Sequence, residues 1–165
     1  MSEKPIKMES VPEAQKTKKS KNRNSPIKRK LDVLEDLDEY KVKYNKHHVI
    51  FGKYATKMTA EQFFRFFAQC QSPCKKTKAF RFLMRTFFND ETLASRSLSG
   101  AASNAYRTLP PKPPLDIKII TDVYYLAKKF LKFDTHMFCR LVTGLCADSV
   151  KLLKKRKKKN VKKQD

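Results

Sequence analysis

The stretch that decides the fold is LVTGLCADSVKLLKK, residues 141–155. Its apolar residues recur three and four positions apart, which is the spacing of a helix that buries one side. We expect this helix to begin near Asp134, to have a candidate kink at Gly144, and to turn Leu145, Leu152 and Leu153 toward the core. Its exposed side is expected to carry the candidate DNA contacts Ser149, Lys151, Lys154, Lys155 and Arg156.

The lysine-rich end of this helix has two interpretations. Lysine favours helix C-termini through the helix dipole, and a run of charge is often only a solvated surface. Here the run continues an amphipathic helix in a chain with a formal net charge of +22. We therefore favour contact with nucleic acid, where serine and lysine can reach base edges in a major groove and lysine can also reach phosphates.

The charge of the chain is concentrated at its two ends. Of the 165 residues, 33% are charged, and the sequence pI is near 10.0. Residues 1–30 contain ten basic and three acidic residues, and residues 151–165 contain nine and one. Such a chain attracts polyanions. No apolar run is long enough to span a bilayer and no signal peptide is visible, so we expect double-stranded DNA rather than a membrane as the partner.

Composition divides the chain into four segments. Residues 1–30 lack apolar periodicity and are expected to be disordered. An acidic, amphipathic linker (31–44), a helical domain (45–156) and a lysine-rich tail (157–165) follow. Two basic clusters in the first segment suit a bipartite nuclear-localisation signal, and hence a nuclear protein, although a solvated charged tail is the alternative. The residues of this signal would be Lys16, Lys18, Lys19, Lys28, Arg29 and Lys30.

Helices are predicted to dominate the folded domain. Residues 79–88 place their apolar side chains on one helical face. The expected helix-capping residues are Thr59, Asn89, Asp116 and Asp134. Before residue 59, alternating apolar residues favour a small hairpin in which residues 40–44 pair with residues 49–51. The predicted fold is therefore mostly α, compact and helical, with a small β-hairpin at its N-terminal edge.

A polar segment of small residues, 95–107, is predicted to be a loop. Hydroxyl groups and free backbone amides suit phosphate contacts, and arginine can enter a minor groove, while an ordinary surface loop is the alternative. The candidate DNA contacts in this loop are Arg96, Ser97, Ser99, Asn104 and Arg107. The proline-rich residues 109–114 form a stiff connection to the next helix.

Catalysis and metal binding have little support in the sequence. The cysteines are spaced C-x3-C (Cys70, Cys74) and C-x6-C (Cys139, Cys146), which does not match a zinc finger or knuckle. There is no glycine-rich phosphate loop, nucleophile elbow or HExxH helix. We therefore expect no metal, no cofactor and no enzymatic activity.

Five short motifs follow one another from about residue 49 to residue 155. They are FLMRTFF (82–88), ETLASRSLSG (91–100), SNA (103–105), KPPLD (112–116) and LVTGLCAD (141–148). In this order and spacing the chain resembles a BEN domain, a family of DNA-binding and chromatin-associated modules. The resemblance implies an α-helical domain that reads duplex DNA with its terminal helix and adjoining loops, often as a homodimer on a palindrome. Some members recruit repressors.

The sequence departs from the family pattern at two places. Val150-Lys151 stands where members often have two basic residues, and Ala147 replaces a family asparagine. Both changes bear on sequence-specific readout and leave phosphate binding intact. We expect a small transcription regulator or chromatin factor. The alternatives are a protein–protein interaction module, such as a co-repressor or scaffold adaptor, held on DNA or RNA by basic tails, and an RNA-binding basic protein.

Overall fold

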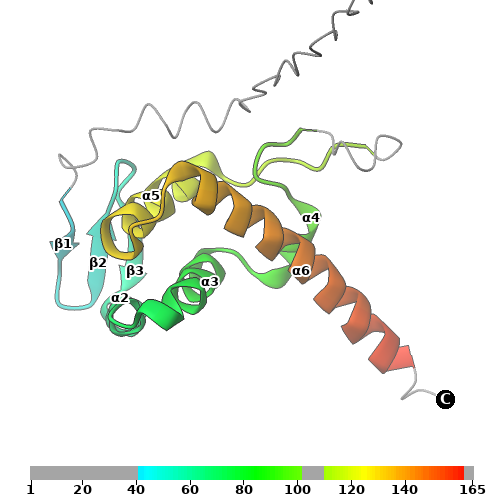
Figure 1. Ribbon diagram of the computed structural model, residues 1–165, viewed down its shortest axis with the longest axis horizontal. Helices are drawn as coiled ribbons and strands as arrows, with labels where there is room; N and C mark the ends of the chain where they lie inside the picture. Colours follow the sequence, from blue (N-terminus) through cyan, green and yellow to red (C-terminus); the bar gives the residue numbers. More distant parts are fainter. Residues whose placement is uncertain (1–40, 102–109, 162–165) are drawn as a thin grey trace, which may run out of the picture.

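The computed structural model describes residues 41–101 and 110–161 (Figure 1). The described chain opens with an antiparallel sheet in the order β1-β2-β3. The strands are β1 (Lys43–Tyr44), β2 (His48–Phe51) and β3 (Thr56–Thr59). Tyr44 lies opposite Val49 across the first pair, and Val49 lies opposite Met58 across the second. The expected hairpin is confirmed, but β1 precedes the expected domain boundary at residue 45, and β3 was not expected.

The remaining elements are helical, which confirms the mostly α fold. They are α2 (Ala60–Cys70), the 3-10 turn η2 (Pro73–Lys75), α3 (Lys76–Phe87), α4 (Asp90–Ser95), α5 (Ile117–Leu126), the π-helical turn η3 (Ala127–Leu131) and α6 (Thr135–Val161). Gly144 does not interrupt the terminal helix, because α6 runs through this exposed residue as one helix. A glycine in a helix costs only about 1 kcal/mol, which packing of the apolar face offsets.

Side-chain caps set where the helices begin. At α2, the Thr59 hydroxyl accepts a bond from the Gln62 amide (3.1 Å), and the Gln62 side chain accepts one from the Thr59 amide (3.0 Å). At α4, the Asn89 side chain accepts a bond from the Thr92 amide (2.7 Å). The carboxylates of Asp116 and Asp134 do the same for Lys118 (2.8 Å) and Met137 (2.6 Å). The four predicted capping residues are therefore confirmed, since each satisfies a free amide of a first turn.

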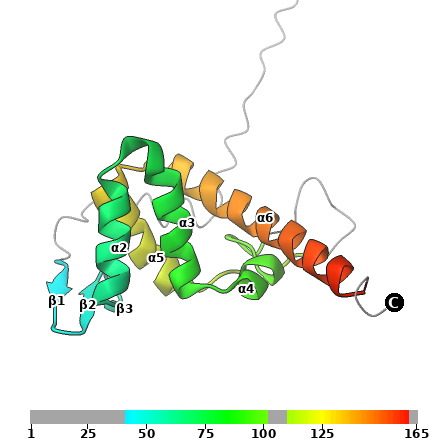
Figure 2. The same cartoon turned by 90° about the horizontal axis from the view of Figure 1, so that it is seen from below.

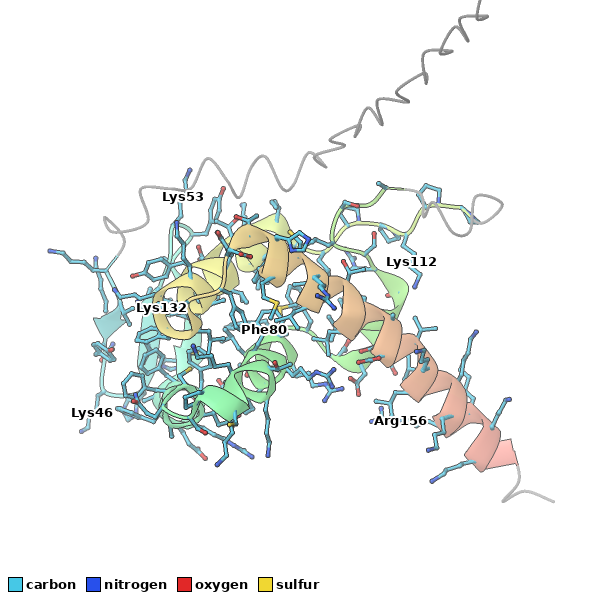
Figure 3. The ribbon with its side chains drawn as sticks, in the orientation of Figure 1. Lys46, Lys53, Phe80, Lys112, Lys132 and Arg156 are labelled. Atoms are coloured by element: carbon cyan, nitrogen blue, oxygen red, sulfur yellow. The ribbon has the colours of Figure 1, made fainter. Side chains whose placement is uncertain are left out.

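The core lies where α3, α5 and α6 meet. Phe80 of α3 lies at its centre (Figure 3), with its ring 5.5 Å from that of Phe138 on α6. The Phe138 ring is also 5.0 Å from that of Tyr124 on α5. All three side chains are buried, and the rings meet edge to face, which is a favoured geometry for aromatic pairs.

A buried carboxylate joins the sheet to α5. Asp122 is fully buried, and it accepts hydrogen bonds from the amides of Tyr54 (3.0 Å) and Thr56 (3.0 Å) and from the Thr56 hydroxyl (2.6 Å). Gly52, at φ +75°, lies so close that a Cβ there would fall 2.3 Å from the carboxylate. The turn between β2 and β3 therefore requires glycine at this position, and Asp122 holds that turn against the helix.

The fold leaves α6 as an arm. Figures 1 and 2 show α6 crossing the body and extending past α4 with its C-terminal half, while the sheet lies at the opposite end of the molecule. Within the described residues, none of the helices combines the length and apolar character needed to cross a membrane.

Candidate nucleic-acid interface

The outward side of α6 carries an unpaired basic row. Successive helical residues are about 100° apart, so Lys151, Lys154, Lys155 and Lys158 share one side of the helix. All four are exposed, and none has an ion-pair or hydrogen-bond partner among the described residues. We call these four residues the lysine row. Lysines with no intramolecular partner remain available to a phosphate backbone.

Ser149 does not belong to this row. The expectation that it is exposed is wrong: its side chain is fully buried, and its hydroxyl oxygen has no hydrogen-bond partner in the part of the chain that the structure describes. Two positions along a helix correspond to a rotation of about 200°, so Ser149 points away from Lys151 and into the fold. On the same inner side Leu145 is buried as expected, whereas Leu152 and Leu153 are half-buried because α6 is leaving the body there.

Arg156 forms an ion pair with α4. Its guanidinium lies 3.2 Å from one carboxylate oxygen of Asp90, and Arg85 of α3 lies 3.4 Å from the other. A third pair, Arg81 with Asp148 at 3.1 Å, ties α3 to α6 further back. Arg156 remains 58% exposed, so the pair contributes modestly to stability while it links the arm to α4.

The loop after α4 holds itself together with the side chains that were candidates for phosphate contacts. The Arg96 guanidinium donates to the Pro114 carbonyl (3.0 Å). The Ser97 hydroxyl donates to the Lys112 carbonyl (3.3 Å) and accepts a bond from the Gly100 amide (3.0 Å). Ser99 accepts a bond from the Ala101 amide (3.2 Å). Asn104 and Arg107 lie outside the described residues. The arginine remains exposed, while the two serines are half-buried and engaged within the loop.

The loop and the proline-rich segment run side by side. The Ser97 amide donates to the Pro113 carbonyl (2.9 Å), and the Leu115 amide donates to the Ser97 carbonyl (2.8 Å). Gly100 adopts φ +68°, and a Cβ there would approach the Pro114 ring to 3.0 Å. The loop is thereby fixed beside α4, close to the start of the arm (Figure 1).

A groove of about 290 Å³ lies between α4 and α6. Its lining combines small apolar side chains with charged ones, from residues Glu91, Ala94, Ser95, Lys112, Val150, Leu153, Lys154 and Lys157. The Lys112 ammonium donates to the Ala94 carbonyl (2.6 Å), which places a positive charge at the C-terminal end of α4. Lys112 on one side of the groove and Lys154 and Lys157 of α6 on the other therefore place basic side chains between the lysine row and the loop. Figure 3 shows Lys112 on the loop side.

Sequence reasoning missed two basic residues of this surface: Lys112, which lines the groove, and Arg140, which is exposed on the outward side of α6. Lys157 and Lys158 were expected in a lysine-rich tail, whereas α6 continues through both of them to Val161. Arg140 lies eleven residues before Lys151, close to three helical turns, so helical periodicity was a sufficient signal for it. For Lys112 there was no such signal, because it comes from a segment without regular periodicity.

The four cysteines of the described chain differ in exposure: Cys146 is buried, Cys70 and Cys139 are half-buried, and Cys74 is exposed. Burial raises the pKa of Cys70 to about 11 and also raises the pKa of Cys146, an effect that the nearby charge of Lys112 opposes. Among residues 41–101 and 110–161, no three histidine, cysteine or acidic side chains come together in a way that could hold a metal ion.

Comparisons with known proteins relate this chain to BEN domains and to structures of DNA complexes. The family model described as BEN domain matches residues 78–157, starting later than the expected Val49. The insv BEN domain, solved with its DNA target site, is 28% identical with a TM-score of 0.57, over 66% of this chain and 93% of that one. Bsg25A, solved with DNA, is 26% identical with a TM-score of 0.57, over 66% and 98%. No curated protein sequence matches significantly. The helical fold, the ordered motifs and the matched residues together show that this chain contains a BEN domain.

Proposed function

We infer that this protein binds double-stranded DNA through the lysine row and acts as a small transcription regulator or chromatin factor. The observation that carries this proposal is the unpaired lysine row on an arm that projects from the body. Support comes from the two similar structures, both of which are complexes with DNA. The loop beside α4 and the Lys112 side of the groove extend the same surface.

Most contacts of this surface are expected to reach phosphates rather than bases. Ala147 and Gly144 separate Arg140 from the lysine row along the outward side of α6, and neither has a polar side chain. Lysine acts as a point charge on a flexible stem, whereas base reading favours the planar fork of arginine or an amide. Arg140 is the outward residue best suited to reading a guanine edge, and the lysine row supplies general affinity.

Selection of random duplex DNA by the purified full chain, at near-physiological salt, tests the proposal. An enriched motif would indicate sequence-specific binding, and a motif with two-fold symmetry would indicate the homodimer that the family resemblance implies. Binding without enrichment, with an affinity that falls steeply as salt rises, would indicate phosphate contacts alone. Failure to bind any duplex at low salt would contradict the proposal.

The nuclear-localisation signal remains a proposal, because residues 1–30 lie outside the described part of the chain. It is tested by fusing residues 1–40 to a large cytosolic reporter. We expect the fusion to enter the nucleus, and replacement of the second cluster, Lys28, Arg29 and Lys30, with alanine to return it to the cytosol. A reporter that stays cytosolic with the intact segment would contradict the signal.

A further inference from the structure

A patch of aromatic rings is exposed at the end of the molecule that lies opposite the arm. Tyr44 of β1 and Phe64 of α2 are 64% and 61% exposed, and Phe67 is 39% exposed. These rings and that of Phe130 surround the buried ring of Phe63, with centroids between 5.6 and 6.3 Å from it. We call Tyr44, Phe64, Phe67 and Phe130 the aromatic patch. Contiguous apolar surface of this kind typically marks a binding site.

The residues next to the patch are mostly basic. Lys43 and Lys46 stand on either side of Tyr44 in the sequence, and Lys128 and Lys132 stand on either side of Phe130. Figure 3 shows Lys46 and Lys132 at this end of the molecule. From β1 to β2, in α2 and in η3, Glu61 is the one acidic residue that the structure describes. A complementary segment would therefore present apolar side chains to the rings and carboxylates to the surrounding lysines.

The chain itself contains such a segment immediately before β1. Residues 31–40 read LDVLEDLDEY and include five acidic residues. At about 100° per residue, Leu31, Val33, Leu34, Leu37 and Tyr40 would fall on one half of a helical projection. Four of the five acids would fall on the other half, while Asp38 would fall between Leu34 and Leu31. The segment lies outside the described residues, so its pattern is known from the sequence alone.

The connection between the segment and the patch is short. Tyr40 precedes Tyr44 by four residues, which span at most about 14 Å when extended. A tether of that length holds the segment at an effective concentration in the millimolar range beside the patch. Even weak complementarity is then enough for binding within one molecule.

We propose that residues 31–40 bind the aromatic patch of their own chain, with the aliphatic side chains against the rings and the carboxylates near the surrounding lysines. This interaction is separate from the DNA surface, because the patch and the arm lie at opposite ends of the molecule (Figure 1). It also keeps the only strongly acidic segment of the sequence away from the lysine row.

Hydrogen–deuterium exchange on the full chain tests the proposal. The amides of residues 31–40 should exchange at least about tenfold more slowly in the full chain than in a free peptide of residues 27–42. Replacing Phe64 with Ser should remove most of this protection, because its exposed ring is available to the segment. Replacing Tyr54 with Ser provides the matched control, since Tyr54 is exposed but lies outside the patch, and protection should persist.

A second variant keeps the test independent of the fold. The double variant Leu34→Asp and Leu37→Asp changes only the segment and should also release it, without loss of the described domain. Exchange of residues 31–40 at the free-peptide rate in the unmodified chain would overturn the proposal. So would protection that survives both sets of substitutions. Protection that rises with protein concentration, together with a dimer in sedimentation, would assign the patch to a second copy and also overturn it.

Discussion

Simultaneous replacement of Lys151, Lys154 and Lys155 with alanine should weaken DNA binding in a salt-dependent way. The three side chains are exposed on one side of α6 and have no partner among the described residues, so each is free to neutralise a phosphate. Each neutralised phosphate contributes about −0.9 to the slope of log affinity against log salt concentration. Loss of three should make the slope shallower by about 2.7.

This slope change has a measurable consequence. Between 50 and 200 mM salt, the unmodified chain should lose about 40-fold more affinity than the variant, because a fourfold change in salt is raised to the power of about 2.7. Fluorescence anisotropy with a labelled duplex at several salt concentrations measures both slopes. The melting temperature should stay nearly unchanged, since exposed substitutions typically alter stability by less than about 0.5 kcal/mol.

A second triple variant separates position from net charge. Replacing Lys46, Lys53 and Lys57 removes the same three charges from the sheet end of the molecule, where Figure 3 shows Lys46 and Lys53. Its slope should remain close to that of the unmodified chain. Equal slope changes in both variants would show that binding depends on total charge, and an unchanged slope in the first variant would refute the lysine row as the DNA surface.

Three further predictions concern stability and reactivity. Asp122→Ala should lower the free energy of unfolding, measured by urea denaturation, by about 3 kcal/mol, because it removes the buried acceptor of three hydrogen bonds. The control Asp148→Ala, which removes an exposed ion pair, should cost less than about 1 kcal/mol. Similar costs for both variants would contradict the stabilising role of the buried Asp122 carboxylate. Gly144→Ala should raise stability by about 0.5–1 kcal/mol, since nothing lies within 4 Å of the added Cβ, and a lower melting temperature would disprove this. Iodoacetamide at pH 8 should modify the exposed Cys74 before Cys70, because burial raises the pKa of the Cys70 thiol to about 11. Equal rates of modification, measured by mass spectrometry, would contradict this.

Much of the fold was predictable because its signals are local. The capping box at Thr59 needs only the side chain three positions later, and the apolar spacing of α3 and α6 needs only neighbouring turns. The order of the motifs pointed to the BEN family, which the family model confirms for residues 78–157. The error at Ser149 was also avoidable, because helical periodicity alone turns it away from Lys151.

The sequence by itself determined the main helices, their caps, the family and the basic character of the terminal helix, but not strand β3. The tertiary structure decided which charges are free: Arg156 pairs with Asp90, and Lys112 caps the end of α4, while the lysine row has no partner within residues 41–101 and 110–161. It also decided that Asp122 holds the turn between β2 and β3. Helical spacing and capping depend on residues within a few positions, so they can be read along the chain. The partner of a charged side chain depends on which distant elements pack together, and only the folded chain specifies that.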